Sequence, residues 1–364
     1  MKISELDTPA LLVDLDRLEH NIERVSAYAR EHDLRLRPHT KTHKTPEVGR
    51  MQVAAGAVGL TVAKVSEAEV MLDSGTPDLL VAYPVLGESK LGRLVEVARK
   101  TAVTVALDSV EAAEGLSRAA AAAGVEISVL VEADVGMQRC GLEPGPRLTG
   151  LAQQVDRLPA LRLRGFAFYP GHIWYPSPEG PEELKKLAAD VARVRADFTA
   201  AGLPLEIVSG GSSPTLFHSH EVAGVNEIRP GTVVFCDRMQ VAAGVATMDD
   251  CAATILTTVI STPRDAFAVI DGGSKTFTSD EVRHTGDSTF GHVVEAPAAR
   301  FARMNEEHGC LELDAVDQPI KIGDRLRIIP NHVCVAVNMH EKMYAVRGDE
   351  VEATWTVRGR GKLQ

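Results

Sequence analysis

The sequence predicts an α/β protein, in which a parallel (β/α)8 barrel of the TIM type is followed by a second, mostly β domain. Between residues 34 and 235, short apolar runs with the character of β-strands alternate with segments of helical periodicity. Beyond residue 252 the strand-like runs continue, but helical segments become few. Strands that alternate with helices pair in parallel, and about eight such units in roughly 200 residues make a barrel of this size. A doubly wound open sheet shows the same alternation and remains the alternative.

The predicted elements follow one another in a regular order. A helix that begins at Asp14 or Asp16 precedes the barrel strands. The barrel strands are expected at residues 34–40, 58–62, 79–81, 103–107, 127–131, 161–168, 205–208 and 227–235. Helices are expected at residues 65–74, 91–100, 110–123 and 181–201. Strands of the second domain are expected at residues 253–260, 266–270, 291–294, 325–329 and 351–357. We therefore expect a barrel at residues 8–238, and a β domain formed by residues 239–364 with the first few residues.

The overall composition is that of a soluble globular protein with two domains. The chain has 364 residues, of which 45% are hydrophobic and 24% charged. Its net charge of −11 argues against a general affinity for nucleic acid or anionic membranes. The five cysteines include no Cys-x-x-Cys pair, which suits a reducing compartment. No stretch is apolar enough to span a bilayer or to serve as a signal peptide. We expect a cytoplasmic protein that binds a small molecule.

The most informative stretch is basic and occupies residues 37–44, at the end of the first predicted barrel strand. It contains Lys41 and Lys44 together with two histidines, behind a proline that keeps the preceding residue extended. Positive charges close to one another favour the neutral form of an amine, and a neutral lysine forms Schiff bases with carbonyl compounds. Catalytic groups of a parallel barrel lie at the carboxyl ends of its strands, as this stretch does. Taken alone, a solvated strand end explains the pattern as well.

A glycine-serine segment follows the seventh predicted strand at residues 209–215. Gly210 and Gly211 would let backbone amides approach an anion closely, and the neighbouring hydroxyls could donate further hydrogen bonds. The segment is short and lacks the lysine of a P-loop, so it fits a single phosphate group better than a nucleoside triphosphate. An ordinary turn is the alternative interpretation.

A pair of potential metal ligands occurs in the second domain, where Cys334 follows His332 by two residues. If these residues lie on a strand, their side chains face the same side and can bind one metal ion. Imidazole and thiolate together suit zinc. Two protein ligands leave positions for water or substrate, as in catalytic metal sites. Taken alone, such a pair in a strand is more often explained by packing.

Together these stretches resemble the D-serine dehydratase and D-threonine aldolase family of pyridoxal-phosphate enzymes, which have the alanine-racemase-type fold (fold type III). The matches run in order from Thr8 to residues 331–334, and residues 38–44 form the most specific motif. The resemblance implies that Lys41, rather than Lys44, binds pyridoxal 5'-phosphate. It also implies a homodimer whose active sites are shared between the chains. It assigns the remaining site residues as follows: a phosphate cradle of Ser209, Gly210, Gly211, Ser212 and Gly231; Arg139 and Tyr169 beside the cofactor ring; and His332 and Cys334 as ligands of a divalent metal, zinc before manganese or magnesium.

The reaction that the resemblance implies is lysis of a β-hydroxy-D-amino acid. In a D-serine dehydratase, Lys41 would remove the α-proton and the metal would make the β-hydroxyl a better leaving group, which yields a 2-oxo acid and ammonia. In a D-threonine aldolase the Cα–Cβ bond breaks instead, and His172 is the candidate base that removes the hydroxyl proton. The aldolases usually carry an aspartate where this chain has Cys334, and their sixth-strand exit differs from Tyr169 to His172. Both departures favour the dehydratase.

Two further hypotheses belong to other classes. An amino-acid racemase would use the same fold and cofactor, without a metal. A non-enzymatic protein that binds pyridoxal phosphate would usually be a barrel alone, so the second domain and its His332–Cys334 pair argue against it.

Overall fold

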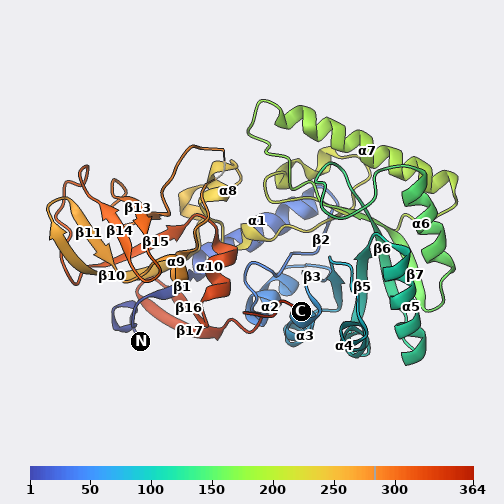
Figure 1. Ribbon diagram of the computed structural model, residues 1–364, viewed down its shortest axis with the longest axis horizontal. Coiled ribbons are helices and arrows are strands. Elements are labelled where there is room, and N and C mark those ends of the chain that lie inside the picture. The colour runs from blue at the N-terminus through green and yellow to red at the C-terminus, as the bar shows by residue number, and fades with distance from the viewer. Residues whose placement is uncertain (283) are drawn as a thin grey trace. The chain divides into compact units, whose positions relative to one another are not determined.

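The computed structural model describes residues 1–282 and 284–364, which form two compact units (Figure 1). The barrel unit consists of Glu23–Lys41, Pro46–Gly231 and Lys362–Gln364. The β unit consists of Met1–Ile22, Thr42–Thr45 and Thr232–Gly361. The long helix α1 (Leu15–Glu31) therefore begins in the β unit and ends in the barrel unit. The basic motif of residues 37–44 is likewise divided between the two units after Lys41.

The barrel unit contains an eight-stranded parallel sheet in the order β2-β9-β8-β7-β6-β5-β4-β3. A parallel bridge between His39 and Thr61 connects the two edges, so the sheet curls into a TIM-like barrel. This confirms the predicted fold class and excludes an open doubly wound sheet. The strands are β2 (Arg35–Leu36), β3 (Leu60–Val62), β4 (Asp78–Val81), β5 (Ala102–Leu107), β6 (Ile127–Ala133), β7 (Leu161–Phe168), β8 (Ile207–Gly210) and β9 (Glu227–Ile228).

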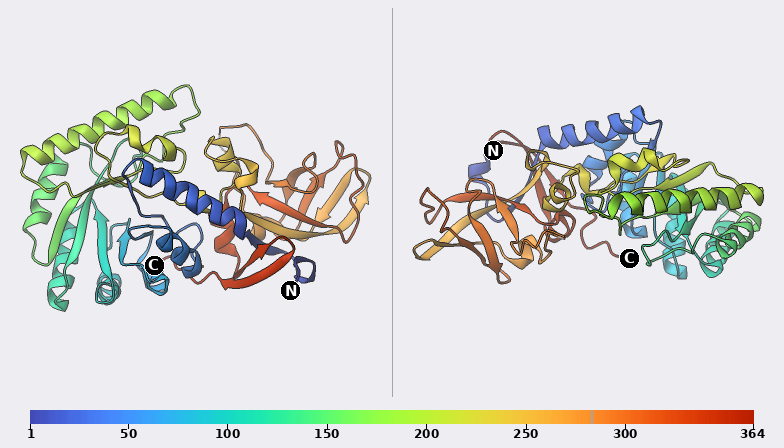
Figure 2. Two further views of the ribbon diagram at one scale, coloured as in Figure 1. Left: turned by 180° about the vertical axis from the view of Figure 1, so that it is seen from behind. Right: turned by 90° about the horizontal axis from the view of Figure 1, so that it is seen from above.

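Helices cover the outer side of these strands (Figures 1 and 2). They are α2 (Pro46–Ala54), α3 (Val65–Met71), α4 (Glu88–Ala98), α5 (Val110–Ala123), α6 (Pro146–Arg157) and α7 (Gly180–Ala200). The limits of α5 follow from its sequence, because the Ser109 hydroxyl accepts the N–H of Ala112 and Gly124 adopts φ 64°. The main core lies between the strands and the helices, and a small apolar cluster from β4 to β8 fills the barrel interior.

Two barrel strands are much shorter than the sequence predicts, and β3 lacks the first two of its predicted residues. Instead of residues 34–40, only Arg35–Leu36 pairs as β2, and instead of residues 227–235, only Glu227–Ile228 pairs as β9. Pro38 and Pro230 follow these pairs and cannot donate a backbone hydrogen bond to a neighbouring strand. Thr232–Val234 forms a 3-10 helix in the β unit.

The β unit is built on a nine-stranded sheet in the order β11-β14-β13-β12-β15-β10-β1-β16-β17, and β11 also pairs with β10. All its pairs are antiparallel except β1 with β16. The strands are β1 (Ala10–Asp14), β10 (Ala253–Arg264), β11 (Phe267–Ile270), β12 (Gly291–Val293), β13 (Arg300–Met304), β14 (Gly309–Glu312), β15 (Arg325–Pro330), β16 (Lys342–Arg347) and β17 (Glu350–Thr356). The predicted segments correspond to β10, β11, β12, β15 and β17, whereas β13, β14 and β16 were not predicted.

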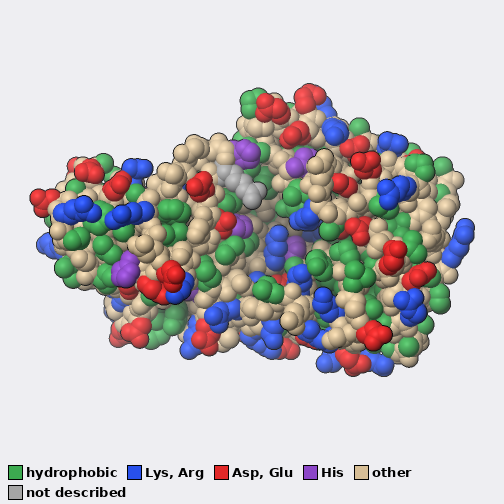
Figure 3. Space-filling view, in the orientation of Figure 1, with side chains coloured by type: hydrophobic (Ala, Val, Ile, Leu, Met, Phe, Trp, Pro, Cys, Tyr) green, Lys and Arg blue, Asp and Glu red, His purple; other side chains and the backbone are tan. Residues whose placement is uncertain are grey.

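Among its described residues, the β unit also contains three short α-helices. They are α8 (Arg238–Ala242), α9 (Ser274–Phe277) and α10 (Val333–Met339). Within the described residues, none of the helices combines the length and the apolar character needed to cross a membrane. On the face shown in Figure 3, acidic and basic side chains of the described residues are interspersed, so this face offers no extended surface of one sign for a polyanion.

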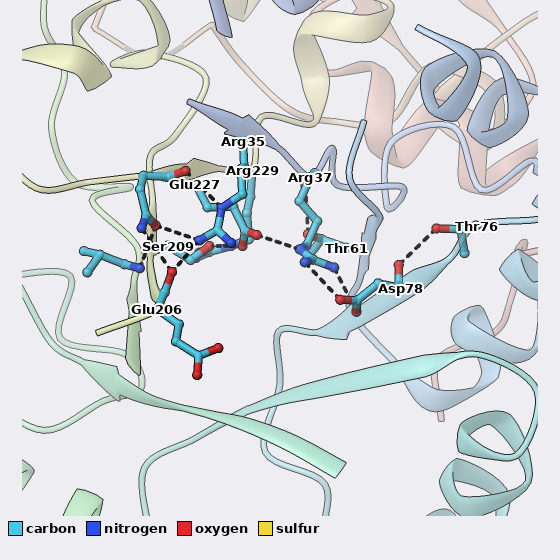
Figure 4. A network of polar contacts seen from close by, with 11 residues as sticks. Arg35, Arg37, Thr61, Thr76, Asp78, Glu206, Ser209, Glu227 and Arg229 are labelled. Carbon is cyan, nitrogen blue, oxygen red and sulfur yellow. Dashed lines mark hydrogen bonds and ion pairs between the residues drawn. The ribbon is translucent and has the colours of Figure 1, made fainter. Parts of the chain in front are cut away.

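A network of buried charges lies within the barrel unit (Figure 4). The guanidinium of Arg37 pairs with Asp78 at 2.9 Å and with Glu227 at 3.0 Å. Glu227 is fully buried, and its other oxygen accepts the Ser209 hydroxyl at 2.7 Å. Arg229 in turn donates to the Ser209 oxygen at 2.5 Å. The network therefore connects β2 with β4, β8 and β9.

Replacement of Arg37 tests how far the barrel depends on this network. Arg37→Met removes the charge that pairs with the fully buried Glu227 and the partly buried Asp78, so we expect the free energy of unfolding to fall by about 3 kcal/mol. As a control, Arg162→Met removes an exposed ion pair with Glu206, 2.9 Å long, and should cost less than about 1 kcal/mol. Urea unfolding curves of both variants measure the difference. Equal losses would show that the buried network contributes no more than a surface pair.

Candidate active-site residues

Lys41 follows β2 and is half-buried in the barrel unit. Its backbone N–H donates to Nδ1 of His39 at 3.3 Å. Its Nζ lies 5.9 Å from the centroid of the Tyr169 ring, and the guanidinium carbon of Arg139 lies 4.8 Å from the same centroid. These residues come from the carboxyl ends of β2, β7 and β6. The structure therefore brings three of the predicted site residues together around one aromatic ring.

Lys44, the competing lysine, has a different environment. It belongs to the β unit, where it is buried and adopts φ 54°. Its Nζ donates to the main-chain carbonyl of Gly359 at 3.4 Å. The amine of Lys44 is thus bonded to the main chain of the β unit, whereas the amine of Lys41 lies over the Tyr169 ring. The geometry favours Lys41 as the reactive amine.

The predicted phosphate segment is divided between a strand and a turn. Ser209 and Gly210 are the last residues of β8, and the Ser209 hydroxyl is engaged with Glu227 and Arg229. A Cβ atom at Gly210 would lie 2.1 Å from the Phe168 ring, so packing alone requires glycine there. Gly211 adopts φ 90°, a conformation that favours glycine, and begins the turn beyond the strand.

This turn has the character of an anion-binding site. The Ser212 N–H and hydroxyl both face Oγ1 of Thr215, at 3.4 and 2.9 Å. A left-handed glycine followed by backbone N–H groups forms the kind of concavity that accepts a phosphate oxygen. Gly231, the remaining predicted member, is buried beside the basic motif, because the preceding Pro230 carbonyl accepts the His39 N–H at 2.9 Å. The residues present therefore fit a single phosphate group.

Glu132 is a polar residue of the barrel mouth that was not among the predicted site residues. It lies on β6 two residues after Leu130, a member of the interior cluster, so its side chain also faces inward. Burial raises the pKa of Glu132, and the nearby Arg229 and Arg139 guanidinium groups oppose this rise. Continuing the strand alternation past residue 131 would have identified it from the sequence.

His172 lies in the loop after β7 and is exposed. A Cβ atom at Gly136 would be 2.9 Å from its Nε2, so the imidazole covers the loop that also carries Arg139. The structure therefore places the His172 ring against Gly136 of that loop. Its role as a base remains a prediction.

The metal pair differs from the prediction in its secondary structure. His332 and Cys334 do not lie on a strand, because β15 ends at Pro330 and His332 is the N-cap of α10, with Cys334 in the first turn of that helix. Pro330 cannot continue the strand ladder as a donor. The Val333 N–H, at the start of α10, donates instead to Asp237 at 2.9 Å. The proposed ligands thus approach each other across a helix N-terminus rather than along one face of a strand.

Polar atoms surround both members of this pair in the β unit. Nδ1 of His332 lies 3.2 Å from Oδ2 of Asp237. Sγ of Cys334 lies 3.2 Å from Oγ1 of Thr42 and 3.6 Å from Oγ1 of Thr232. Burial lowers the pKa of His332, but the Cys334 sulfur and the Asp237 carboxylate outweigh burial and raise this pKa to about 11.

These surroundings favour a positive charge between imidazole and sulfur. A divalent metal would replace the proton on His332, and imidazole with thiolate is a donor set that zinc accepts. Among the described residues, no cluster of three or more His, Cys, Asp or Glu side chains is placed to hold a metal ion. His332 and Cys334 alone would form a site with two protein ligands, whose other positions would be filled by water or substrate.

Comparison with known proteins finds a family match for each of the two parts of the chain. Residues 13–239 match the alanine racemase N-terminal domain, and residues 252–346 match a putative serine dehydratase domain. A 3-hydroxy-D-aspartate aldolase of Paracoccus denitrificans is 33% identical over 100% of this chain and 94% of its own length. A D-threo-3-hydroxyaspartate dehydratase of a Delftia species is 32% identical over 96% of this chain and 97% of its own length.

Solved structures of similar enzymes superpose on nearly the whole chain. A D-threonine aldolase from Filomicrobium marinum superposes with a TM-score of 0.93 at 31% identity, covering 100% of this chain and 98% of the other. A metal-free form of a cysteine-to-alanine variant of a D-threo-3-hydroxyaspartate dehydratase superposes with a TM-score of 0.89 at 30% identity, with 98% of each chain covered. These relatives are lyases, which disfavours the racemase hypothesis.

Because the pKa of Glu132 is raised, ionisation of this carboxyl should lower the stability of the folded protein. A carboxyl whose pKa is higher in the folded than in the unfolded protein destabilises the fold once it is ionised, and this penalty disappears as the pH falls below its unfolded pKa of about 4.3. We therefore expect Glu132→Gln to raise the melting temperature near neutral pH, with a gain that shrinks on acidification. Thermal unfolding of both proteins between neutral and acidic pH measures this gain.

Glu206 provides a control, because its replacement by glutamine should change the melting temperature in the opposite direction. Hydrogen bonds from Arg162 and Arg164 lower the pKa of this exposed carboxylate, so Glu206→Gln should lower the melting temperature slightly near neutral pH. This loss should vanish as the pH falls through the pKa of Glu206. A Glu132→Gln variant that also loses stability near neutral pH would show that its contacts with arginine outweigh its burial.

Proposed function

Because the chain belongs to the D-serine dehydratase and D-threonine aldolase family, we propose that it is a lyase of β-hydroxy-D-amino acids that depends on pyridoxal phosphate and a divalent metal. We further propose that it is a dehydratase, which releases a 2-oxo acid and ammonia. The observation that carries this choice is the His332–Cys334 pair, with a sulfur ligand where the aldolases usually have an aspartate. The metal-free cysteine variant of the related dehydratase supports the link between a cysteine and the metal.

Residues of the barrel would bind the cofactor and move a proton. Pyridoxal phosphate, when bound, supplies an electron sink for bond cleavage at the substrate Cα. Nζ of Lys41 would hold the cofactor aldehyde, and the same nitrogen, once released, is the base for the α-proton. The Gly211–Ser212 turn would hold the phosphate. Tyr169 would lie beside the ring, with the Arg139 guanidinium 4.8 Å from the tyrosine ring centroid.

Residues of the β unit would hold the metal. Sγ of Cys334 and an imidazole nitrogen of His332 would be its protein ligands, and the metal supplies Lewis acidity toward the β-hydroxyl of the substrate. The Thr42 and Thr232 hydroxyls lie close enough to Sγ to donate hydrogen bonds to a thiolate. We propose zinc as this metal, and a cytoplasmic homodimer with shared active sites as the working form.

Aldol cleavage is the second candidate function. It is favoured by the TM-score of 0.93 with a D-threonine aldolase and by the 33% identity to a 3-hydroxy-D-aspartate aldolase. In that reaction a base must remove the proton of the β-hydroxyl, and His172 is the candidate. The two reactions give different products from the same substrate, so a product assay separates them.

The first test is to supply D-serine, D-threonine and D-3-hydroxyaspartate to the holoenzyme and to measure all products. We expect 2-oxo acid and ammonia in equal amounts, because loss of the β-hydroxyl is followed by hydrolysis of the resulting enamine. A chelator should abolish turnover and added zinc should restore it. Glycine and an aldehyde would establish the aldolase instead, and activity that survives complete metal removal would exclude the metal.

The assignment of Lys41 is tested with Lys44 as the matched control. Lys41→Ala should lose the long-wavelength absorbance of the bound cofactor, since no amine remains to hold it, and turnover should fall by several orders of magnitude. Lys44→Gln should keep this absorbance, because its amine is bonded to Gly359. Borohydride reduction of the wild-type protein followed by peptide mass spectrometry identifies the modified lysine directly. A cofactor attached at Lys44 would contradict the assignment.

A further inference from the structure

Asp237 is a buried carboxylate that connects two helix starts in the β unit. It is the N-cap of α8, where its Oδ1 accepts the Gln240 N–H at 2.9 Å. Its Oδ2 accepts the Val333 N–H at 2.9 Å and lies 3.2 Å from Nδ1 of His332. The side chain is 0% exposed. A buried carboxylate is stable only when both oxygens are hydrogen-bonded, as they are here.

The contact with His332 determines which ring nitrogen can bind a metal. An ionised carboxylate only accepts hydrogen bonds, so Nδ1 of His332 must carry a proton to bond with Oδ2 of Asp237. Nε2 is then the nitrogen with a lone pair for a metal. The same oxygen accepts the N–H of Val333, the next residue. Oδ2 of Asp237 therefore fixes the main chain after His332 and the orientation of its ring together.

The rest of the segment is held by other groups. Asn331, which precedes His332, accepts from the Arg238 guanidinium at 2.6 Å and donates to the carbonyl oxygens of Asp280 and Thr289. Arg238 also pairs with Asp287, so its charge is engaged there. Asp237 is thus the acidic side chain that the structure directs at the imidazole of His332.

We infer that Asp237 is a positioning residue of the metal site, which holds His332 with Nε2 available to the metal and Nδ1 protonated. This inference rests on the metal dependence proposed above. A carboxylate behind a ligating imidazole orients the ring and increases its basicity, and removal of such a partner typically weakens metal binding roughly 10–100-fold. Asp237 is therefore part of the metal site without being a metal ligand.

The test is the zinc affinity of Asp237→Asn, measured by competition with a chromophoric chelator. The amide preserves the shape of the side chain but lacks the carboxylate charge, so we expect roughly 10–100-fold weaker zinc binding than in the wild-type protein. Asp271→Asn is the matched control: the oxygens of Asp271 also accept two hydrogen bonds in the β unit, from Thr8 at 2.5 Å and Thr258 at 2.9 Å, outside the metal pair. It should bind zinc as the wild-type protein does. Melting temperatures of the metal-free proteins separate a loss of affinity from a loss of folding.

The outcomes distinguish a failure of the role of Asp237 from a failure of the proposed metal dependence. Asp237→Asn with wild-type zinc affinity would overturn the inference and leave the proposed function intact. A wild-type protein that binds no zinc would overturn the proposed metal itself. If Asp237→Asn fails to fold, nitrogen NMR of the zinc-bound wild-type protein with labelled histidine decides, with the His332 signals identified by their loss in His332→Gln. Zinc on Nε2 and a proton on Nδ1 are expected, and zinc on Nδ1 would refute the role of Asp237.

Discussion

The buried charge of Arg37 is the constraint on which the barrel mouth depends. Its guanidinium is held by Asp78 and Glu227, and the second oxygen of Glu227 holds the hydroxyl of Ser209. Lys41 follows Arg37 by four residues, and the Gly211 turn begins two residues after Ser209. The segment with Lys41 and the segment with the Gly211 turn are therefore anchored to one hydrogen-bonded network. Such a network specifies an arrangement more than it adds stability, because desolvation of its charges offsets their attraction.

Along the chain, the motif of residues 37–44 connects the lysine proposed to hold the cofactor with the surroundings of the proposed metal site. Lys41 is the last residue of its segment in the barrel unit, and Thr42, the next residue, belongs to the β unit. There the Thr42 hydroxyl lies 3.2 Å from Sγ of Cys334. A displacement of the motif would therefore affect both the amine proposed to hold the cofactor and the environment of the proposed thiolate ligand.

The sequence was sufficient for features that depend on local pattern, but not for those that depend on distant contacts. Alternating strands and helices predicted the barrel, and the lysine motif follows β2 at its carboxyl end, as expected. The valine-rich segment Val333–Met339 has the composition of a strand yet forms α10, because a proline ends β15 and Asp237 binds the first turn of the helix. Asp237 and His332 are 95 residues apart, and no local pattern connects them. Glu132 was missed for a simpler reason, since its strand was ended too early.

A metal with only two protein ligands depends strongly on the groups behind those ligands. Four ligands would define the position of an ion by themselves, whereas two ligands leave it free to shift as water or substrate enters. In this protein Asp237 restrains the imidazole of His332, and the Thr42 and Thr232 hydroxyls flank the sulfur of Cys334. In the proposed function, the metal would act as a Lewis acid at the β-oxygen of the substrate in either reaction. The placement of the proposed metal would therefore depend on residues that are not its ligands, whichever bond the enzyme breaks.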